Sequence, residues 1–84
     1  VWHTDGTGTL IEVKTCIHNR NHDLSGIGQL LYYGAVAEKV LGCMPRLVFA
    51  APEINISVYN VVKKFNLLIS FLMIDGERCI YLGG

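Results

Sequence analysis

The chain has 84 residues, 51% of them hydrophobic, with a formal net charge of zero and a mean hydropathy of +0.38. This length forms a single domain, residues 1–84, and excludes a second core. The balanced charge excludes a strong basic field, which counts modestly against a nuclease because most such proteins collect phosphate with Lys and Arg. A domain this small buries only about 60% of its unfolded surface, so the apolar excess predicts a homo-oligomer.

The cysteines and the lengths of the apolar runs predict the cellular location. Cys16, Cys43 and Cys79 are odd in number and widely spaced, which is typical of reduced thiols in a cytoplasmic protein. No apolar run approaches the roughly 20 residues that a membrane span requires, and the sequence shows no signal peptide. We therefore expect a cytoplasmic protein with no membrane partner.

The N-terminal segment is predicted to form a β-hairpin. Two stretches rich in β-branched residues, 1–4 and 9–15, flank a tetrapeptide that contains two glycines. A turn at positions 6–7 places Val1 opposite Glu12. This register decides which residues lie beside the polar side chains of the second strand.

The strand at residues 10–15 carries an acid and a base on one face. Alternation puts Glu12 and Lys14 on one side and Ile11 and Val13 on the other. A carboxylate can hold a divalent cation, and a neighbouring ammonium can neutralise charge that develops on a phosphate. The alternative is a solvated strand face with a weak ion pair.

A polar connection follows at residues 16–23. Its spacing of Cys16, His18 and His22 contains zinc-ligand residue types but matches no closed four-ligand pattern. A fourth ligand would have to come from a distant part of the chain. We therefore interpret this connection as a solvated loop rather than a structural metal site.

A long helix and a buried strand come next. Asp23 or Ser25 can cap the helix and Gly42 can end it, while Gly34 in its middle indicates close approach to a sheet. The continuous apolar run at residues 46–51 predicts a central strand with both faces covered. Strand, helix and strand form a βαβ unit, so this strand should run parallel to the preceding one.

The remaining elements complete a mixed sheet. Hydrophobic spacing predicts a second helix at residues 58–65 and a buried strand at 67–74. Asp75-Gly76 is a strong turn signal, and residues 78–82 return as an edge strand. The predicted fold class is α/β (α+β), with the element order β-β-α-β-α-β-β.

Gln29 and Tyr33 are four residues apart and share one face of the long helix. Both side chains carry polar groups that need hydrogen-bond partners when buried. They are either ordinary core residues that are satisfied locally or part of a binding surface.

Together, the strand Leu-Ile-Glu-Val-Lys-Thr and the following Ile-Gly-Gln-Leu-Leu-Tyr-Tyr helix resemble the restriction-endonuclease-like superfamily of PD-(D/E)XK nucleases. The resemblance is greatest to branches with an E-x-K strand followed by a Q-x-x-x-Y helix, such as RecB-like nucleases. It covers about residues 10–52. It implies a restriction-endonuclease-like core and Mg²⁺-dependent hydrolysis of DNA phosphodiesters.

The resemblance also implies a role for each matching residue. Glu12 would bind Mg²⁺, with the Val13 carbonyl as a second ligand. Lys14 would orient the attacking water and stabilise the charged transition state. Gln29 and Tyr33 would line the groove and hold the DNA strand.

The sequence departs from the family pattern because it lacks a Pro-Asp pair and an N-terminal helix. In the predicted hairpin Asp5 lies opposite Gly8, which is four residues (12 − 8 = 4), or about 13 Å, from Glu12 along the strand. We therefore expect the second metal-binding aspartate to lie upstream of Val1 and this form to be nearly inactive. The alternative function is a non-catalytic, oligomeric binding or assembly module of the same fold.

Overall fold

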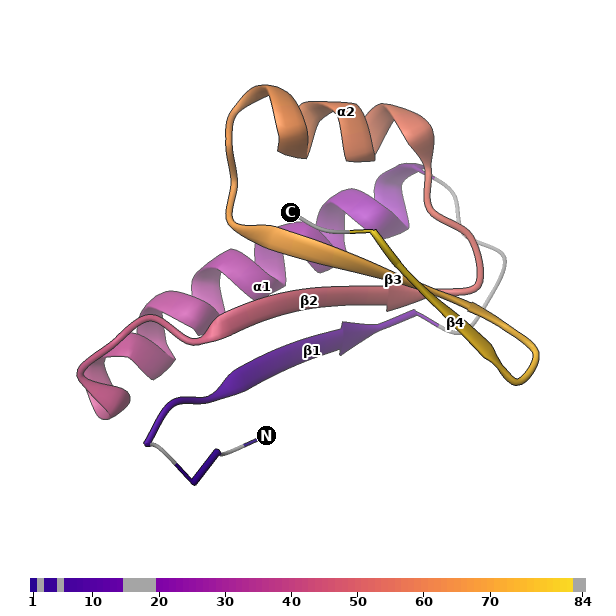
Figure 1. The fold of residues 1–84 in the computed structure, drawn as a ribbon. Helices are drawn as coiled ribbons and strands as arrows, with labels where there is room; N and C mark the ends of the chain where they lie inside the picture. Colours follow the sequence, from indigo (N-terminus) through magenta and orange to yellow (C-terminus); the bar gives the residue numbers. More distant parts are fainter. Residues whose placement is uncertain (2, 5, 15–19, 83–84) are drawn as a thin grey trace.

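The computed structural model describes residues 1, 3, 4, 6–14 and 20–82, with the backbone alone at 20–22. It has four strands and two helices in this part of the chain (Figure 1). The elements are β1 (Thr9–Val13), α1 (Arg20–Leu41), β2 (Arg46–Ala51), α2 (Ile56–Lys64), β3 (Ile69–Asp75) and β4 (Arg78–Leu82).

The four strands form one mixed sheet in the order β1-β2-β3-β4. The first three strands are parallel, and β4 is antiparallel to β3. In the first pair Glu12 lies opposite Phe49, and α1 connects the two strands. The predicted mixed sheet and the predicted parallel pairing across the long helix are confirmed.

Both helices pack on the same face of the sheet, so the described part of the chain forms two layers (Figure 1). Between the layers lies one hydrophobic core. Its buried members are Ile27, Leu30, Leu47, Phe49, Ala51, Val58, Val62, Ile69 and Phe71. The rings of Phe49 and Phe71 meet edge to face with their centroids 6.0 Å apart, a favourable aromatic geometry.

Two glycines let α1 lie close to the sheet. A Cβ atom added to Gly34 would lie 2.9 Å from Leu47 Cδ2, and one added to Gly26 would lie 2.6 Å from Phe49 Cε2. Both distances are shorter than ordinary van der Waals contacts. The expected close approach at Gly34 is confirmed, and Gly26 is a second position of the same kind.

The strand β2 is buried on both faces, as expected, but for two different reasons. Leu47 and Phe49 lie beneath the helices, whereas Val48 and Ala50 point to the other face. Among the described residues no helix covers that open face. Val48 and Ala50 are shielded by side chains of the flanking strands, because β2 lies between β1 and β3.

The predicted N-terminal hairpin is wrong in its strand and its register. Val1 exchanges backbone hydrogen bonds with Thr9, so it does not lie opposite Glu12, and the described residues before β1 form no strand. The backbone N–H of Gly6 donates to the carbonyl of His3 (3.1 Å), which closes a turn earlier than expected. The register is therefore shifted by three residues (12 − 9 = 3). Asp5 lies outside the described residues.

The start of the long helix also differs from the prediction. α1 already begins at Arg20, so Asp23 is in its first turn and is not its cap. Asp23 is fully buried, and its Oδ2 accepts a hydrogen bond from the backbone N–H of Asn55 at 3.2 Å. The C-terminal prediction is confirmed: Gly42 follows the helix with a φ of +80°, a conformation that favours glycine.

The second helix is two residues longer at its N-terminus than predicted and begins after Asn55. The side-chain oxygen of Asn55 accepts hydrogen bonds from the backbone N–H groups of Ser57 and Val58 (3.0 and 3.3 Å), which is typical of an N-cap. After the helix, the backbone N–H of Leu67 donates to the carbonyl of Val62, so Leu67 is still bonded to α2. The strand β3 therefore begins at Ile69, two residues later than predicted.

Candidate functional site

The acidic and basic side chains of β1 point toward α1. Glu12 is paired with Phe49, whose ring packs against Gly26 of the helix, so both side chains lie on the helix-covered face. The Glu12 and Lys14 side chains are only 24% and 23% exposed. Ile11 and Val13, on the other face, are 45% and 51% exposed. This is the reverse of an ordinary half-buried strand, in which the apolar side chains face the core.

Glu12 is at the centre of a small polar cluster. Lys14 Nζ lies 3.4 Å from Glu12 Oε1. With the Gln29 amide nitrogen turned toward the carboxylate, Nε2 lies 2.9 Å from Oε1 and 3.3 Å from Oε2. In this orientation the amide nitrogen faces acceptors and the amide oxygen faces donors. In the opposite orientation the oxygen would face only acceptors and the nitrogen only donors. The structure therefore brings Glu12, Lys14 and Gln29 together, and Gln29 holds the carboxylate as a hydrogen-bond donor.

Gly26 makes room for this cluster. A Cβ atom at this position would lie 3.1 Å from Lys14 Cε, in addition to its closer contact with the Phe49 ring. Gly28, which lies next to Gln29 in the sequence, would accept a Cβ in open space. Sequence reasoning missed Gly26. The available signal was a glycine three residues before Gln29 on the same side of the helix.

Tyr33 lies one helical turn beyond Gln29, and its side chain is exposed. Its ring contacts Tyr32 edge to face, with the centroids 5.3 Å apart. Within the described part of the chain it makes no hydrogen bond to Glu12, Lys14 or Gln29. The structure thus brings together three of the four predicted side chains and leaves Tyr33 at the periphery.

The Val13 carbonyl points to the outer edge of the sheet. The backbone N–H of Lys14 donates to the carbonyl of Ala50 in β2 at 2.9 Å, and the Val13 carbonyl belongs to the same trans peptide group, in which C=O and N–H point in opposite directions. The carbonyl of Val13 therefore faces away from β2, at the carboxyl end of β1. Open sheets with parallel strands bind their ligands at this end.

The described residues supply few oxygen ligands for a metal ion. No three His, Cys, Asp or Glu side chains of these residues lie close enough together to hold one. Carboxylate and carbonyl oxygens, such as those of Glu12 and Val13, are the ligand types that Mg²⁺ takes in small number together with several waters. Cys16 and His18 lie outside the described residues, as does the side chain of His22. The loop interpretation of that segment therefore stays a prediction.

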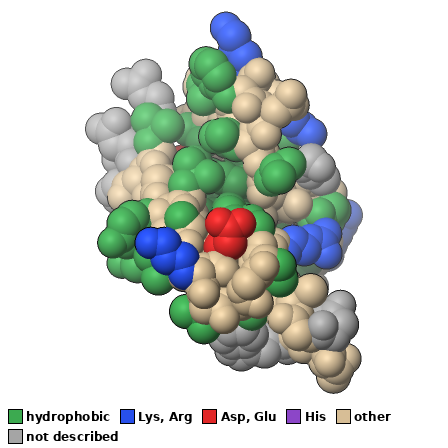
Figure 2. All heavy atoms as spheres, turned by 90° about the vertical axis from the view of Figure 1, so that its left-hand side faces the viewer, with side chains coloured by type: hydrophobic (Ala, Val, Ile, Leu, Met, Phe, Trp, Pro, Cys, Tyr) green, Lys and Arg blue, Asp and Glu red, His purple; other side chains and the backbone are tan. Residues whose placement is uncertain are grey.

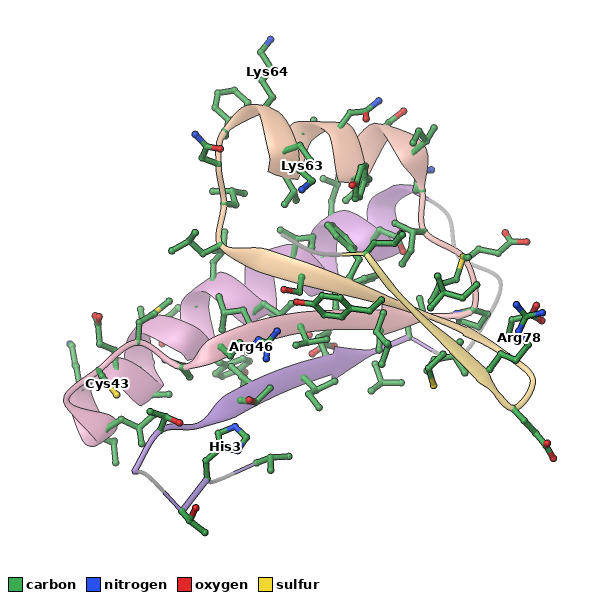
Figure 3. All side chains as sticks on the ribbon, viewed as in Figure 1. His3, Cys43, Arg46, Lys63, Lys64 and Arg78 are labelled. Atoms are coloured by element: carbon green, nitrogen blue, oxygen red, sulfur yellow. The ribbon has the colours of Figure 1, made fainter. Side chains whose placement is uncertain are left out.

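The basic side chains of the described residues do not gather into one patch. Figure 3 shows Arg46 on β2, Lys63 and Lys64 on α2 and Arg78 on β4, pointing in different directions. This distribution agrees with the zero formal net charge of the chain. Long-range attraction of a nucleic acid is correspondingly weak, so recognition would depend on local contacts.

Comparisons with family models, curated proteins and solved structures found no match to this chain. Neither helix is long and apolar enough, in the part of the chain that the structure describes, to cross a membrane. Cys43 and Cys79 are free and exposed.

Proposed function

We propose that this chain carries a Mg²⁺-dependent phosphodiesterase site that acts on DNA, built on a restriction-endonuclease-like core. The observation that carries the proposal is the inward orientation of the polar side of β1. A strand that exposes Ile11 and Val13 while holding Glu12 and Lys14 against α1 sacrifices apolar burial, which is expected where a function requires the polar groups.

Each residue has a distinct role in this proposal. Glu12 and the Val13 carbonyl hold the metal ion, and Lys14 stabilises negative charge on the phosphate in the transition state. Gln29 is a positioning residue, because its amide fixes the Glu12 carboxylate. Tyr33 contacts the DNA strand beside the cluster. The bound Mg²⁺ supplies Lewis acidity and lowers the pKa of a water molecule.

The metal site is tested with Glu12→Gln. Calorimetric titration with Mg²⁺ should show binding to the wild-type protein and at least a tenfold weaker affinity in the variant. Glu38→Gln is the matched control because it removes a carboxylate from the exposed outer side of α1. Unfolding in urea should show that both variants are folded. Unchanged Mg²⁺ affinity in a folded Glu12→Gln variant would contradict the proposal.

The position of the second metal ligand needs a separate experiment. The hairpin register that separated Asp5 from Glu12 is wrong, so Asp5 is the aspartate to test as the second ligand. Mg²⁺-dependent DNA cleavage by this chain that is abolished by Asp5→Asn would support that role, and unchanged cleavage in Asp5→Asn would exclude it.

The second candidate function is a non-catalytic assembly module of the same fold. Exposed hydrophobic side chains favour it, and Figure 2 shows hydrophobic side chains spread over the end of the molecule where α1 ends, with an acidic side chain among them and Lys or Arg side chains beside them. Large hydrophobic residues that are exposed toward the C-terminal ends of the two helices include Val36, Val40, Met44, Phe65 and Leu68. A protein that binds no Mg²⁺ but forms stable oligomers would fit this alternative.

A further inference from the structure

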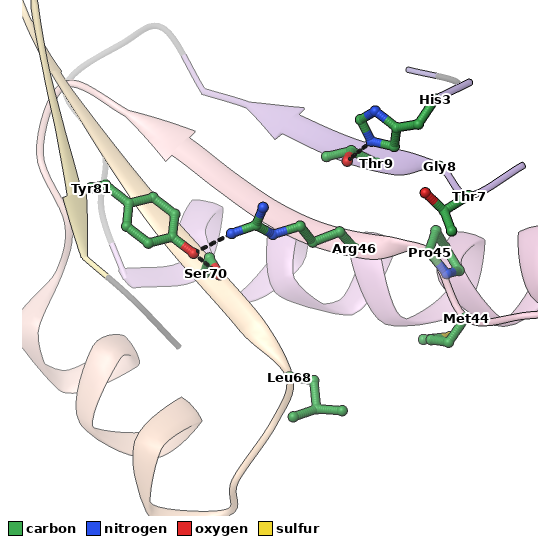
Figure 4. Close-up of a pocket in the computed structure, with 10 residues that line it drawn as sticks. All are labelled: His3, Thr7, Gly8, Thr9, Met44, Pro45, Arg46, Leu68, Ser70 and Tyr81. Carbon is green, nitrogen blue, oxygen red and sulfur yellow. Dashed lines mark hydrogen bonds between the residues drawn. The ribbon is translucent and has the colours of Figure 1, made fainter. Parts of the chain in front are cut away.

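A hollow lies near the beginning of β1 and β2, and the strands line it with side chains of the open sheet face (Figure 4). Its volume is about 490 Å³, within the range of small-molecule sites, roughly 300–1,000 Å³. Thr9, Arg46, Ser70 and Tyr81 contribute one residue from each of the four strands. Each alternates with a neighbour that points into the helix-covered core, so the pocket is separate from the Glu12 cluster.

Three of these side chains form a hydrogen-bonded chain across the pocket. Arg46 Nη2 donates to the Tyr81 hydroxyl at 2.7 Å, and the Tyr81 hydroxyl donates to Ser70 Oγ at 2.8 Å (Figure 4). The Arg46 guanidinium carbon also lies 5.7 Å from the centre of the Tyr81 ring. These contacts hold the guanidinium in one place, which reduces the entropy that a bound ligand would otherwise have to offset.

The pocket carries a positive charge that no described neighbour neutralises. None of the described residues that line it is Asp or Glu, and Arg46 makes no ion pair within the described part of the chain. Only one of the five guanidinium N–H groups is used by Tyr81. The Ser70 hydroxyl and the Arg46 guanidinium both lower the pKa of Tyr81, as expected where the surroundings favour a negative charge.

A second group of donors lies on the other wall. His3 Nε2 is 2.7 Å from the Thr9 hydroxyl, and both side chains face the same hollow (Figure 4). Tyr81 already donates its only hydroxyl proton to Ser70, so the remaining donors are four Arg46 N–H groups (5 − 1 = 4), the Ser70 hydroxyl and one hydrogen of the His3–Thr9 pair. These donors outnumber the roughly four acceptor sites of a carboxylate. A phosphate group, with three terminal oxygens, uses such a set more completely.

The pocket is also larger than a single inorganic ion requires. The side chains of Met44, Pro45 and Leu68 supply an apolar part of its wall. We propose that this pocket binds a small phosphate monoester, with the phosphate held by Arg46 and the hydroxyl groups and the organic part on the apolar wall. The site is independent of the proposed metal site.

The test is a titration followed by amide NMR, with phenyl phosphate, inorganic phosphate and benzoate as probes. Phenyl phosphate should shift the Arg46, Ser70 and Tyr81 resonances saturably, and inorganic phosphate should bind at least tenfold more weakly. Benzoate has the same ring and a carboxylate, and it should cause no saturable shift at the same concentration. Benzoate binding as tight as phenyl phosphate, or no saturation with either phosphate, would overturn the proposal.

Variants locate the binding in the pocket. Arg46→Gln should weaken phenyl phosphate by tenfold or more, and Tyr81→Phe should weaken it less because the guanidinium remains. Arg78→Gln is the matched control, since it removes the same side chain from the far end of β4 and should leave the affinity unchanged. If Arg46→Gln and Arg78→Gln lost the same affinity for phenyl phosphate, the binding would depend only on the overall charge of the protein, and the proposed site would be overturned. Glu12→Gln should leave phenyl phosphate affinity unchanged, whatever its effect on Mg²⁺.

Discussion

The cluster around Glu12 shows which residue-scale features the sequence can predict. Alternation along β1 places Glu12 and Lys14 on one face, and helical spacing places Gln29 and Tyr33 on one side of α1. Neither rule gives the crossing of the helix over the sheet. That crossing brings Gln29 to 2.9 Å from the Glu12 carboxylate and leaves Tyr33 exposed. The direct bond between amide and carboxylate could therefore not be predicted.

Tyr81 provides a prediction at the same scale. Hydrogen bonding to the Ser70 hydroxyl, followed by contact with the Arg46 guanidinium, lowers its pKa below the ordinary tyrosine value of about 10. A titration of the tyrosine ring carbons by NMR should show this lowered pKa for Tyr81. Both Ser70→Ala and Arg46→Gln should raise it, and an unchanged pKa in both variants would contradict the assignment.

The lowered pKa of Tyr81 also determines how the free energy of unfolding should change with pH. Because the folded state favours ionised Tyr81, ionisation of this side chain stabilises the fold. The stabilisation is fully present above about pH 10 and is lost as the pH falls through the lowered pKa. We therefore expect the difference in the free energy of unfolding between the wild type and Tyr81→Phe, measured in urea, to move in favour of the wild type as the pH rises from 7 to 10.5. A difference that moves the other way would show that Tyr81 ionises more readily when unfolded.

At the scale of elements, the sequence predicts interiors better than ends. The bounds of β2 are correct because a continuous apolar run is closed by Pro52. The predicted start of α1 is too late in the sequence, because residues 20–22 are polar and show no hydrophobic periodicity that would mark them as helical. The hairpin register is wrong because backbone hydrogen bonds of His3 set the turn, and no side-chain pattern marks them.

The packing of α1 on the sheet gives a prediction with an internal control. Gly26→Ala places a methyl group 2.6 Å from the fully buried Phe49 ring, which cannot move into solvent, so we expect a loss of about 1–3 kcal/mol in the free energy of unfolding. Gly28→Ala meets open space and gains helix propensity, so it should stabilise the protein by up to ~1 kcal/mol. Urea unfolding curves measure both.

The Gly26→Ala variant also tests whether the helix and the site are coupled. The added methyl group would lie 3.1 Å from Lys14 Cε, so the Lys14 side chain, which pairs with Glu12, must move by a few tenths of an ångström. Equal stability of Gly26→Ala and Gly28→Ala would show that α1 does not pack as closely as the structure indicates.

At the scale of the whole molecule, the two-layer arrangement leaves much apolar surface exposed. Both helices lie on one face of the sheet, and the other face exposes about half of Ile11, Val13 and Tyr81. The outer side of α1 adds further exposed residues, including Val36 and Val40. Composition predicted this excess, but it could not say which faces carry it, because that depends on where the helices pack.

This surface leads to the prediction of self-association. A stable interface buries about 1,200–2,000 Å² in total, and exposed apolar side chains on several faces favour forming one. We expect light scattering to give at least the mass of a dimer, 18.6 kDa (2 × 9.3 kDa), at micromolar concentration. Apolar contacts are not screened by salt, so the mass should persist in 1 M NaCl, where the Debye length is about 3 Å. A mass of 9.3 kDa at high protein concentration would show that the exposed apolar surface does not drive association of this chain with itself.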